Sequence, residues 1–391
     1  MKILAIETSC DDTGIAVLEV LPNGRQRLLA NLVSSQIKVH APWGGVVPSL
    51  AAREHQRNLL PLLIKALSES KLLKTSQSQI PIAKQIQKSK LKNLEKILER
   101  EPELAKQLIP FLKKYPKPPV DCLAVTAGPG LEPALWAGVN LARALACFWR
   151  LPIIPANHIK GHLLAALAEK KSDKNYFPAI GLVVSGGHTQ LVLIRISSGN
   201  VLKYRIIGET RDDAAGEAFD KVAKMLGLGY PGGPAIAAKA AKFKIENLKL
   251  KINKLPRPML RSGDFDFSFS GLKTAVLYAL QKMSPTQIKR QTPAIAAEFQ
   301  QAVIDVLSAK TSAAVKKYEA KTIVLAGGVA ANSALRQELK NQAKKLKVKF
   351  LSPAPEFCSD NAAMIALAAE EDIGRKTGWQ KIKADANWRI G

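Results

Sequence analysis

The chain has little cysteine, a deficit of acidic residues and no long apolar run. Its 391 residues include only 4 cysteines, and none of these forms a Cys-x-x-Cys pair. This usage excludes a disulfide-rich scaffold and a thiolate zinc site, and it favours reduced thiols. No apolar run reaches the roughly 18 residues of a membrane-spanning helix, and the N-terminus lacks the apolar stretch of a signal peptide. We therefore expect a cytoplasmic protein with no membrane association.

The shortage of acidic residues gives the chain an unusually large positive charge. It has 58 Lys and Arg against 32 Asp and Glu, a formal net charge of +26. Such a balance favours a polyanionic partner, above all a nucleic acid, although a basic surface can also serve solubility alone. The hydrophobic share of 47% and charged share of 23% are ordinary for a globular protein. This length predicts two or three domains of about 100–200 residues each.

Two common motifs are also absent. The sequence contains no GxxxxGK[ST] and no HExxH, which argues against a P-loop and a zinc peptidase. Glycine-rich junctions instead follow predicted strands at residues 125–130, 183–187 and 325–329. None of these junctions is a GxGxxG fingerprint, which argues against a dinucleotide-binding fold. Glycine lets backbone N–H groups approach a phosphate, and the next helix adds its positive end. These junctions predict a nucleotide site of another kind.

The order of predicted elements indicates α/β layers. Strands ending in glycine and feeding a helix are typical of parallel sheets. Two hairpins of similar design, near residues 3–20 and 180–196, suggest a duplicated, two-lobed fold. Residues 71–118 are basic and interrupted by proline, so we interpret them as a surface insertion outside the core, with one short amphipathic helix. Further basic runs at 239–261 and 340–349 are candidate nucleic-acid surfaces.

The strongest local signal is the segment NHIKGH, which places His158 and His162 four residues apart. On a helix these side chains share one face and could hold one metal ion. The alternative is two helical histidines in ordinary hydrogen bonds, but the chain has only 5 histidines. A two-histidine site needs a third ligand, commonly a carboxylate, and would suit Fe(II) or Zn(II). Asp360, at a predicted helix start, could be that ligand or only the N-cap.

Two further segments carry polar clusters. DDAAGEAFDK places acids at a helix start, where they complement the helix dipole. Asp220 lies two turns further on and could accept hydrogen bonds from a ribose or an amine. The alternation in DFDFSFSGLKT predicts a strand with buried phenylalanines, and its serines and Lys273 could face an anion.

Taken together, the motifs resemble one family. They occur in that family's order as IETSCDDTG, GGVVPSLAAREH, AGPGL, NHIKGH, VSGGHTQL, DDAAGEAFDK, GYPGGP, DFSFSGLKT, LAGGVAANSALR and CSDNAAM. This series, over about residues 1–65 and 120–371, is similar to the tRNA threonylcarbamoyl-adenosine synthesis enzymes of the TsaD type, once called O-sialoglycoprotein endopeptidases.

The resemblance implies an α/β, two-lobed actin-like ATPase fold, as in sugar kinases, Hsp70 and actin, with duplicated mixed sheets flanked by helices. It implies an N-terminal lobe of residues 1–152 plus 360–391, which would carry the insertion 71–118. Residues 153–359 would form the C-terminal lobe, and the active site would lie in the cleft between the lobes.

The resemblance also implies a reaction. The threonylcarbamoyl group of L-threonylcarbamoyl adenylate passes to N6 of the adenosine 3′ of the anticodon, at tRNA position 37, and AMP leaves. The tRNAs concerned read codons that start with adenine. The implied metal ligands are His158, His162 and Asp360. The implied substrate-binding residues are Val183, Val184, Ser185, Gly186, Gly187, Asp220, Gly233 and Asn332. Thr8 and Ser9 would lie near the phosphates, and Asp12 is a candidate general base.

The implied cofactor is one divalent ion per subunit, Fe²⁺ or Zn²⁺, beside the adenylate or an ATP-type nucleotide with or without Mg²⁺. The implied partners are tRNA, an inactive paralogue and a small ATPase. Two alternatives from other classes are an actin-like small-molecule kinase, which would leave the histidine pair without a role, and a non-catalytic scaffold of the same modification complex. A metallopeptidase lacks its catalytic base here.

Overall fold

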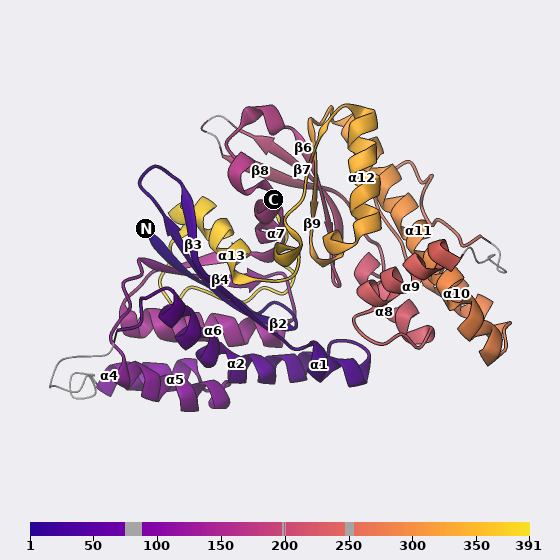
Figure 1. The fold of residues 1–391 in the computed structure, drawn as a ribbon. Helices are drawn as coiled ribbons and strands as arrows, with labels where there is room; N and C mark the ends of the chain where they lie inside the picture. The colour runs from indigo at the N-terminus through magenta and orange to yellow at the C-terminus, as the bar shows by residue number, and fades with distance from the viewer. Residues whose placement is uncertain (75–87, 198, 200, 247–253) are drawn as a thin grey trace. The chain divides into compact units, whose positions relative to one another are not determined.

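The computed structural model describes residues 1–74, 88–197, 199, 201–246 and 254–391 (Figure 1). The chain forms two compact units. The first comprises Met1–Lys38, Val46–Leu164 and Asp360–Arg389, and the second comprises Val39–Gly45, Ala165–Ser359 and Ile390–Gly391. The first unit therefore extends past the predicted boundary at residue 152. The reason is that strand β5 (Ile153–Asn157) pairs with β4 (Cys122–Gly128) of the first sheet.

The first unit is built on a five-stranded sheet in the order β3-β2-β1-β4-β5. β1 (Lys2–Glu7), β2 (Asp12–Val20) and β3 (Gln26–Ser35) form an antiparallel meander, while β4 and β5 run parallel to β1. β1 and β4 are buried along almost their whole length, as their continuous apolar runs predict.

The second unit repeats this topology with the order β8-β7-β6-β9-β10. β6 (Ala179–Val184), β7 (Thr189–Ile196) and β8 (Leu202–Glu209) are antiparallel, and β9 (Thr322–Ala326) and β10 (Lys349–Leu351) run parallel to β6. The predicted duplication of mixed sheets is therefore confirmed. β3 and β8, the strands at matching ends of the two sheets, were not among the predicted strands.

Helices cover both faces of the first sheet (Figure 1). α2 (Pro48–Glu69) and α6 (Glu132–Trp149) pack on β2 and β4, and α13 (Ala362–Glu371) packs on β1 and β2. The short helix α1 (Ile37–His40) precedes α2.

The basic segment 71–118 is part of the first core, which corrects the prediction of a surface insertion. Its described residues form two helices, α4 (Lys88–Ile97) and α5 (Pro102–Lys114), rather than one. Leu94, Leu104 and Leu108 are fully or almost fully buried and join the same hydrophobic cluster as α2 and α6. The lysines of these helices made the segment look like a solvated loop, but the apolar stripe between them decides its place. Residues 75–87 of the predicted insertion lie outside the described residues.

In the second unit, α8 (Ala215–Met225), α9 (Gly232–Glu246) and α10 (Ser270–Gln281) pack with the long α11 (Pro285–Lys317) and α12 (Ser333–Leu346). The DFDFSF segment does not form a strand. Phe267 makes only an isolated bridge to Thr210, and α10 begins at Ser270. Of the phenylalanines predicted to be buried, Phe267 and Phe269 are fully buried in the core of this unit, whereas Phe265 is only partly buried.

Among the described residues, no helix combines the length and the apolar character that crossing a membrane requires.

Candidate functional site

The candidate metal centre lies in the first unit, at the start of α7 (His158–Leu167), which follows β5 directly. The side chain of Asn157 accepts a hydrogen bond from the backbone N–H of Lys160 at 3.1 Å and so caps the helix. His158 and His162 project from successive turns, with ring centroids 4.6 Å apart and planes inclined by 83°. The predicted helical pairing of the histidines is confirmed.

Asp360 reaches the histidines because α13 packs closely on α7. A Cβ on Gly161 would lie 3.2 Å from the side chain of Met364, so only glycine permits this approach without displacement. Oδ1 of Asp360 is 3.5 Å from Nε2 of His158 and 3.1 Å from Nε2 of His162. The N-cap of α13 is Asn361, whose side chain accepts from the backbone N–H of Met364. The alternative that Asp360 is the cap is therefore wrong.

Two polar side chains contact the Nδ1 edge of His158. Its Nδ1 lies 3.1 Å from Oγ of Ser9 and 3.3 Å from Oε2 of Glu7. The fully buried Glu7 carboxylate also accepts hydrogen bonds from the hydroxyl of Thr126 and the backbone N–H of Ser9. When the ring of His158 is neutral, an Nδ1–H donated to these oxygens leaves Nε2 unprotonated toward Asp360, the tautomer that a metal ligand needs.

The electrostatics of this cluster favour a cation. Burial alone would lower the pKa of His158, but the negative charges of Asp360 and Glu7 and the hydrogen bond to Glu7 raise it to about 9. Burial would raise the pKa of Glu7, but the charge of His158 lowers it. A site that stabilises a positive charge on an imidazole also stabilises a bound metal ion.

The donor set fits a divalent ion. Ligand atoms from His158, His162 and Asp360 all lie within 4.8 Å of one another. Nε2 of His162 is buried and makes no hydrogen bond of acceptable geometry among the described residues, although Oδ1 of Asp360 lies only 3.1 Å away. Buried imidazole nitrogens are rarely left unsatisfied, and two potential ligand atoms that face one another without a hydrogen bond are what a metal site would show. Two imidazoles and one carboxylate suit Zn(II) or Fe(II) and leave coordination positions for a substrate.

The other predicted residues of the first unit lie on the β1–β2 hairpin. Asp12 begins β2, and one of its carboxylate oxygens is buried without a hydrogen-bond partner in the described chain. Burial, followed by the charge of Asp360, raises its pKa to about 7. Thr8 and Ser9 are almost completely buried, and the Ser9 hydroxyl contacts His158. Their proximity to phosphates stays a prediction.

The predicted substrate loop follows β6 in the second unit. Val183 and Val184 are buried at the end of the strand. Ser185 closes the turn, because its backbone N–H donates to the carbonyl of His188 and its hydroxyl oxygen accepts from the backbone N–H of His188. Gly186 and Gly187 are exposed, and a Cβ on either would meet no atom within 4 Å. The loop thus has the exposed glycines that a phosphate cradle requires.

Other segments lie very close to the loop 183–187 at the carboxyl edge of the second sheet. A Cβ on Gly216 would lie 2.5 Å from the carbonyl oxygen of Ser185, and one on Gly327 would lie 2.4 Å from that of Val184. α8 and the turn after β9 thus approach the loop 183–187. Ligands of mixed and parallel α/β sheets bind at such an edge.

Asp220, Gly233 and Asn332 belong to the same unit. Asp220 accepts a hydrogen bond from the backbone N–H of Gly232 at 2.6 Å, which ties α8 to the start of α9 beside Gly233. Asn332 caps α12 through its side-chain oxygen and donates to Gln300. Their roles toward a nucleoside stay predictions.

The structure adds residues that sequence analysis missed. Glu7 stands out only as an acid at the end of an apolar strand, and nothing local connects it with His158, which is 151 residues away. The anion that the serines of DFSFSG face belongs to the protein itself, because Ser268 and Ser270 donate to the carboxylate of Asp212. Lys273 is likewise paired, with Asp213 at 2.8 Å.

Comparison with known proteins places these motifs in a family. The family model described as "TsaD: tRNA N6-adenosine threonylcarbamoyltransferase" matches residues 27–85 and 103–367. The unmatched stretch between the two segments, 86–102, contains α4 and is narrower than the predicted insertion 71–118. A protein of Aromatoleum aromaticum named tRNA N6-adenosine threonylcarbamoyltransferase is 42% identical over 94% of this chain and 90% of its own length. One of the same name from Nitrosospira multiformis is 42% identical over 100% of this chain and 97% of its own length.

Among solved structures, HypF of T. kodakarensis aligns with 96% of this chain and 48% of its own length, with a TM-score of 0.54 and 12% sequence identity. This similarity concerns the fold alone. It agrees with the duplicated mixed sheets and with the two-lobed actin-like ATPase architecture that the sequence predicts.

Proposed function

The chain belongs to the tRNA N6-adenosine threonylcarbamoyltransferase family, and from this premise we propose how its residues perform the transfer. The protein modifies tRNA by placing a threonylcarbamoyl group on N6 of an adenosine. We infer that the donor is L-threonylcarbamoyl adenylate, that AMP leaves, and that a divalent ion held by His158, His162 and Asp360 takes part. Family membership also decides against the kinase and scaffold alternatives.

The observation that carries the metal proposal is the buried, unsatisfied imidazole of His162 beside Asp360. These two residues and His158 would hold the ion. When bound, a Zn²⁺ or Fe²⁺ ion would orient the donor's oxygen atoms and polarise its carbonyl group. Glu7 and Ser9 fix the ring of His158 through its Nδ1, so that Nε2 stays directed at the site.

The loop 183–187 would bind the adenylate. Gly186 and Gly187 are exposed and have no side chain, so a phosphate would approach their backbone N–H groups closely. These groups would stabilise the negative charge that develops on the departing AMP. A mixed carbamoyl-phosphate anhydride is already activated, so the protein needs no covalent nucleophile. Placement of the carbonyl carbon near the weakly basic adenosine amine is the main requirement.

Asp12 is the proposed general base. Its pKa of about 7 lies near neutral pH, where a base can both be ionised and accept a proton effectively. The net charge of +26 fits a tRNA substrate, whose phosphates need neutralisation. An inactive paralogue and a small ATPase would be its protein partners, as in the bacterial systems that the sequence resembles.

The test is product formation by the purified protein. Unmodified tRNA and synthetic threonylcarbamoyl adenylate are incubated with the protein, and the digested nucleosides are analysed by mass spectrometry. We expect threonylcarbamoyladenosine from the wild type, its loss after chelation, and recovery with Fe²⁺ or Zn²⁺. His162→Ala should abolish product and metal binding, whereas His40→Asn, a buried histidine outside the cluster, should retain metal. Full activity of metal-free protein would refute the metal proposal.

A further inference from the structure

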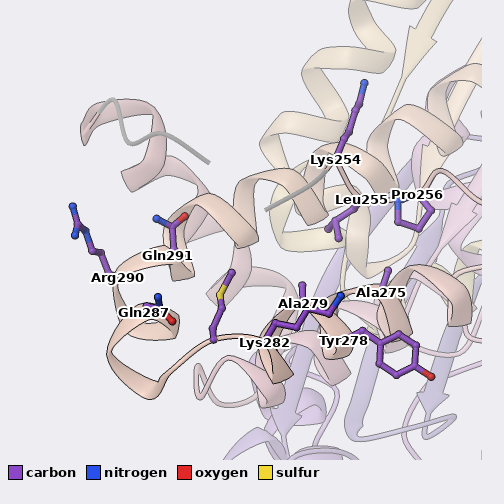
Figure 2. Close-up of a pocket in the computed structure, with 11 residues that line it drawn as sticks. Lys254, Leu255, Pro256, Ala275, Tyr278, Ala279, Lys282, Gln287, Arg290 and Gln291 are labelled. Carbon is purple, nitrogen blue, oxygen red and sulfur yellow. The ribbon is translucent and has the colours of Figure 1, made fainter. Parts of the chain in front are cut away.

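A pocket of about 710 Å³ lies in the second unit between α10, the start of α11 and the segment that precedes α10 (Figure 2). It falls within the range of small-ligand sites, roughly 300–1,000 Å³. It belongs neither to the metal centre nor to the loop 183–187. The lining residues are Lys254, Leu255, Pro256, Ala275, Tyr278, Ala279, Lys282, Met283, Gln287, Arg290 and Gln291.

The charged side chains that line this pocket are all cationic. Lys254, Lys282 and Arg290 line it, and no Asp or Glu is among the described lining residues. None of the three cations makes a salt bridge within the part of the chain that the structure describes. Figure 2 shows Arg290 and Tyr278 on opposite sides of the view, with Lys282 between them. The cations are therefore spread along the pocket, as successive negative charges would require.

The pocket also presents an aromatic ring and an apolar lining. Tyr278 is 59% exposed, unusual for a large aromatic side chain. Ala275, Ala279 and Met283 add apolar surface from the same helical segment and its end. A ring on an apolar surface beside cations is the combination that binds unpaired nucleotides, because the base stacks on the ring while the phosphate meets the cations.

We propose that this pocket binds unpaired nucleotides of the tRNA substrate, with Tyr278 stacking on a base and Lys282 and Arg290 contacting phosphates. The inference rests on the tRNA-modifying function above and extends it to a second contact surface. A duplex could supply the phosphates but not an exposed base face, since its bases are stacked on one another. An acidic peptide would satisfy the cations but give the exposed ring no matching partner.

The experiment measures binding of unmodified tRNA by fluorescence anisotropy at several salt concentrations. Tyr278→Ala should weaken binding by about 5- to 150-fold with little change in salt dependence, because stacking is worth about 1–3 kcal/mol per base. Tyr278→Phe keeps the ring and should bind like the wild type. Lys282→Gln with Arg290→Gln should reduce the slope of log affinity against log salt by about 2, one for each phosphate contact. Lys203→Gln, an exposed lysine on β8 outside the pocket, is the matched control for general charge and should lower affinity much less.

Wild-type binding by both the Tyr278→Ala and the double variant would overturn the proposal and leave an acidic peptide as the better occupant. Equal losses in the double variant and the Lys203→Gln control would also overturn it, because only overall charge would then matter. The same preparations are assayed for threonylcarbamoyladenosine. If the wild type forms product while the pocket variants bind tRNA normally, only this inference fails. If the wild type binds tRNA but forms no product, the proposed function fails instead.

Discussion

Replacing Glu7 with glutamine should weaken metal binding without touching a ligand. The carboxylate is fully buried and has three contacts: the backbone N–H of Ser9, the hydroxyl of Thr126 and Nδ1 of His158. Oε1 accepts from Ser9, and an amide nitrogen cannot accept. The glutamine oxygen must therefore stay on Ser9, which turns the amide NH₂ toward His158.

The consequence is a change of tautomer. Nδ1 of His158 would now accept a hydrogen bond from the amide, so the ring proton would move to Nε2, the atom that faces Asp360 at 3.5 Å. Residues that hold a metal-binding histidine contribute about 10- to 100-fold to metal affinity. Since Glu7→Gln removes a buried charge and also opposes the required tautomer, we expect the upper end, about 100-fold or roughly 2.7 kcal/mol.

The measurement is Zn²⁺ affinity of the full chain near pH 7, by competition with a chromophoric chelator. Glu101→Gln is the matched control, because Glu101 is also a buried carboxyl of the first unit but pairs with Asn140, away from the ligands. The control should bind Zn²⁺ like the wild type. Circular dichroism of both variants verifies the fold. Unchanged Zn²⁺ affinity in a folded Glu7→Gln protein would show that our account of His158 is wrong.

Three further predictions concern stability. Burial raises the pKa of Glu101 from 4.5 to about 7, so ionisation of Glu101 destabilises the fold and the wild type loses stability as the pH rises from 4.5 through 7. In denaturant titrations at pH 8, Glu101→Gln should therefore be more stable than the wild type by on the order of 3 kcal/mol. Near pH 4.5 it should show no gain. Gly216→Ala should lower the free energy of unfolding by about 1–3 kcal/mol, because its Cβ would lie 2.5 Å from the Ser185 carbonyl oxygen. Gly233→Ala, which has open space at the Cβ, should melt at the wild-type temperature or above. A higher melting temperature for Gly216→Ala than for Gly233→Ala would contradict this account of the packing. Arg257→Met should lower the free energy of urea unfolding by about 3–5 kcal/mol, because it leaves the carboxylates of Glu298 and Asp305 without a cation. A decrease of less than about 1 kcal/mol would mean that solvent already screens the two carboxylates.

Some features of the fold could be read from local sequence patterns. β1, β4 and β6 are continuous apolar runs, and each is buried almost throughout. β3 and β8 escaped prediction because they lie at the ends of their sheets and alternate irregularly between buried and exposed residues. Such strands form because the edge of the neighbouring strand has backbone N–H and C=O groups that need partners. Local sequence periodicity carries no information about that neighbour.

For the basic segment 71–118, the sequence led us to predict a surface insertion where the structure has helices packed in the core. Lysine is its commonest residue and proline recurs along it, yet Leu104 and Leu108 of α5 enter the first core. Pro102 occupies the first turn of α5, where proline is tolerated. Pro110 lies in the interior, yet α5 continues through it to Lys114. Burial against α2 and α6 decides the position of these leucines, and composition over a window cannot show which face a residue occupies.

The sequence by itself determined the histidine pair, because residues four apart on a helix share a face whatever surrounds them. It also determined the duplicated sheets, since each half carries its own apolar hairpin. Only the tertiary structure decided that Asn361 caps α13 while Asp360 joins the histidines, and that Glu7 holds His158 from β1. These partners are separated by some 150 to 200 residues of chain. Nothing in their own neighbourhoods specifies the pairing, which arises when the strands and helices between them pack.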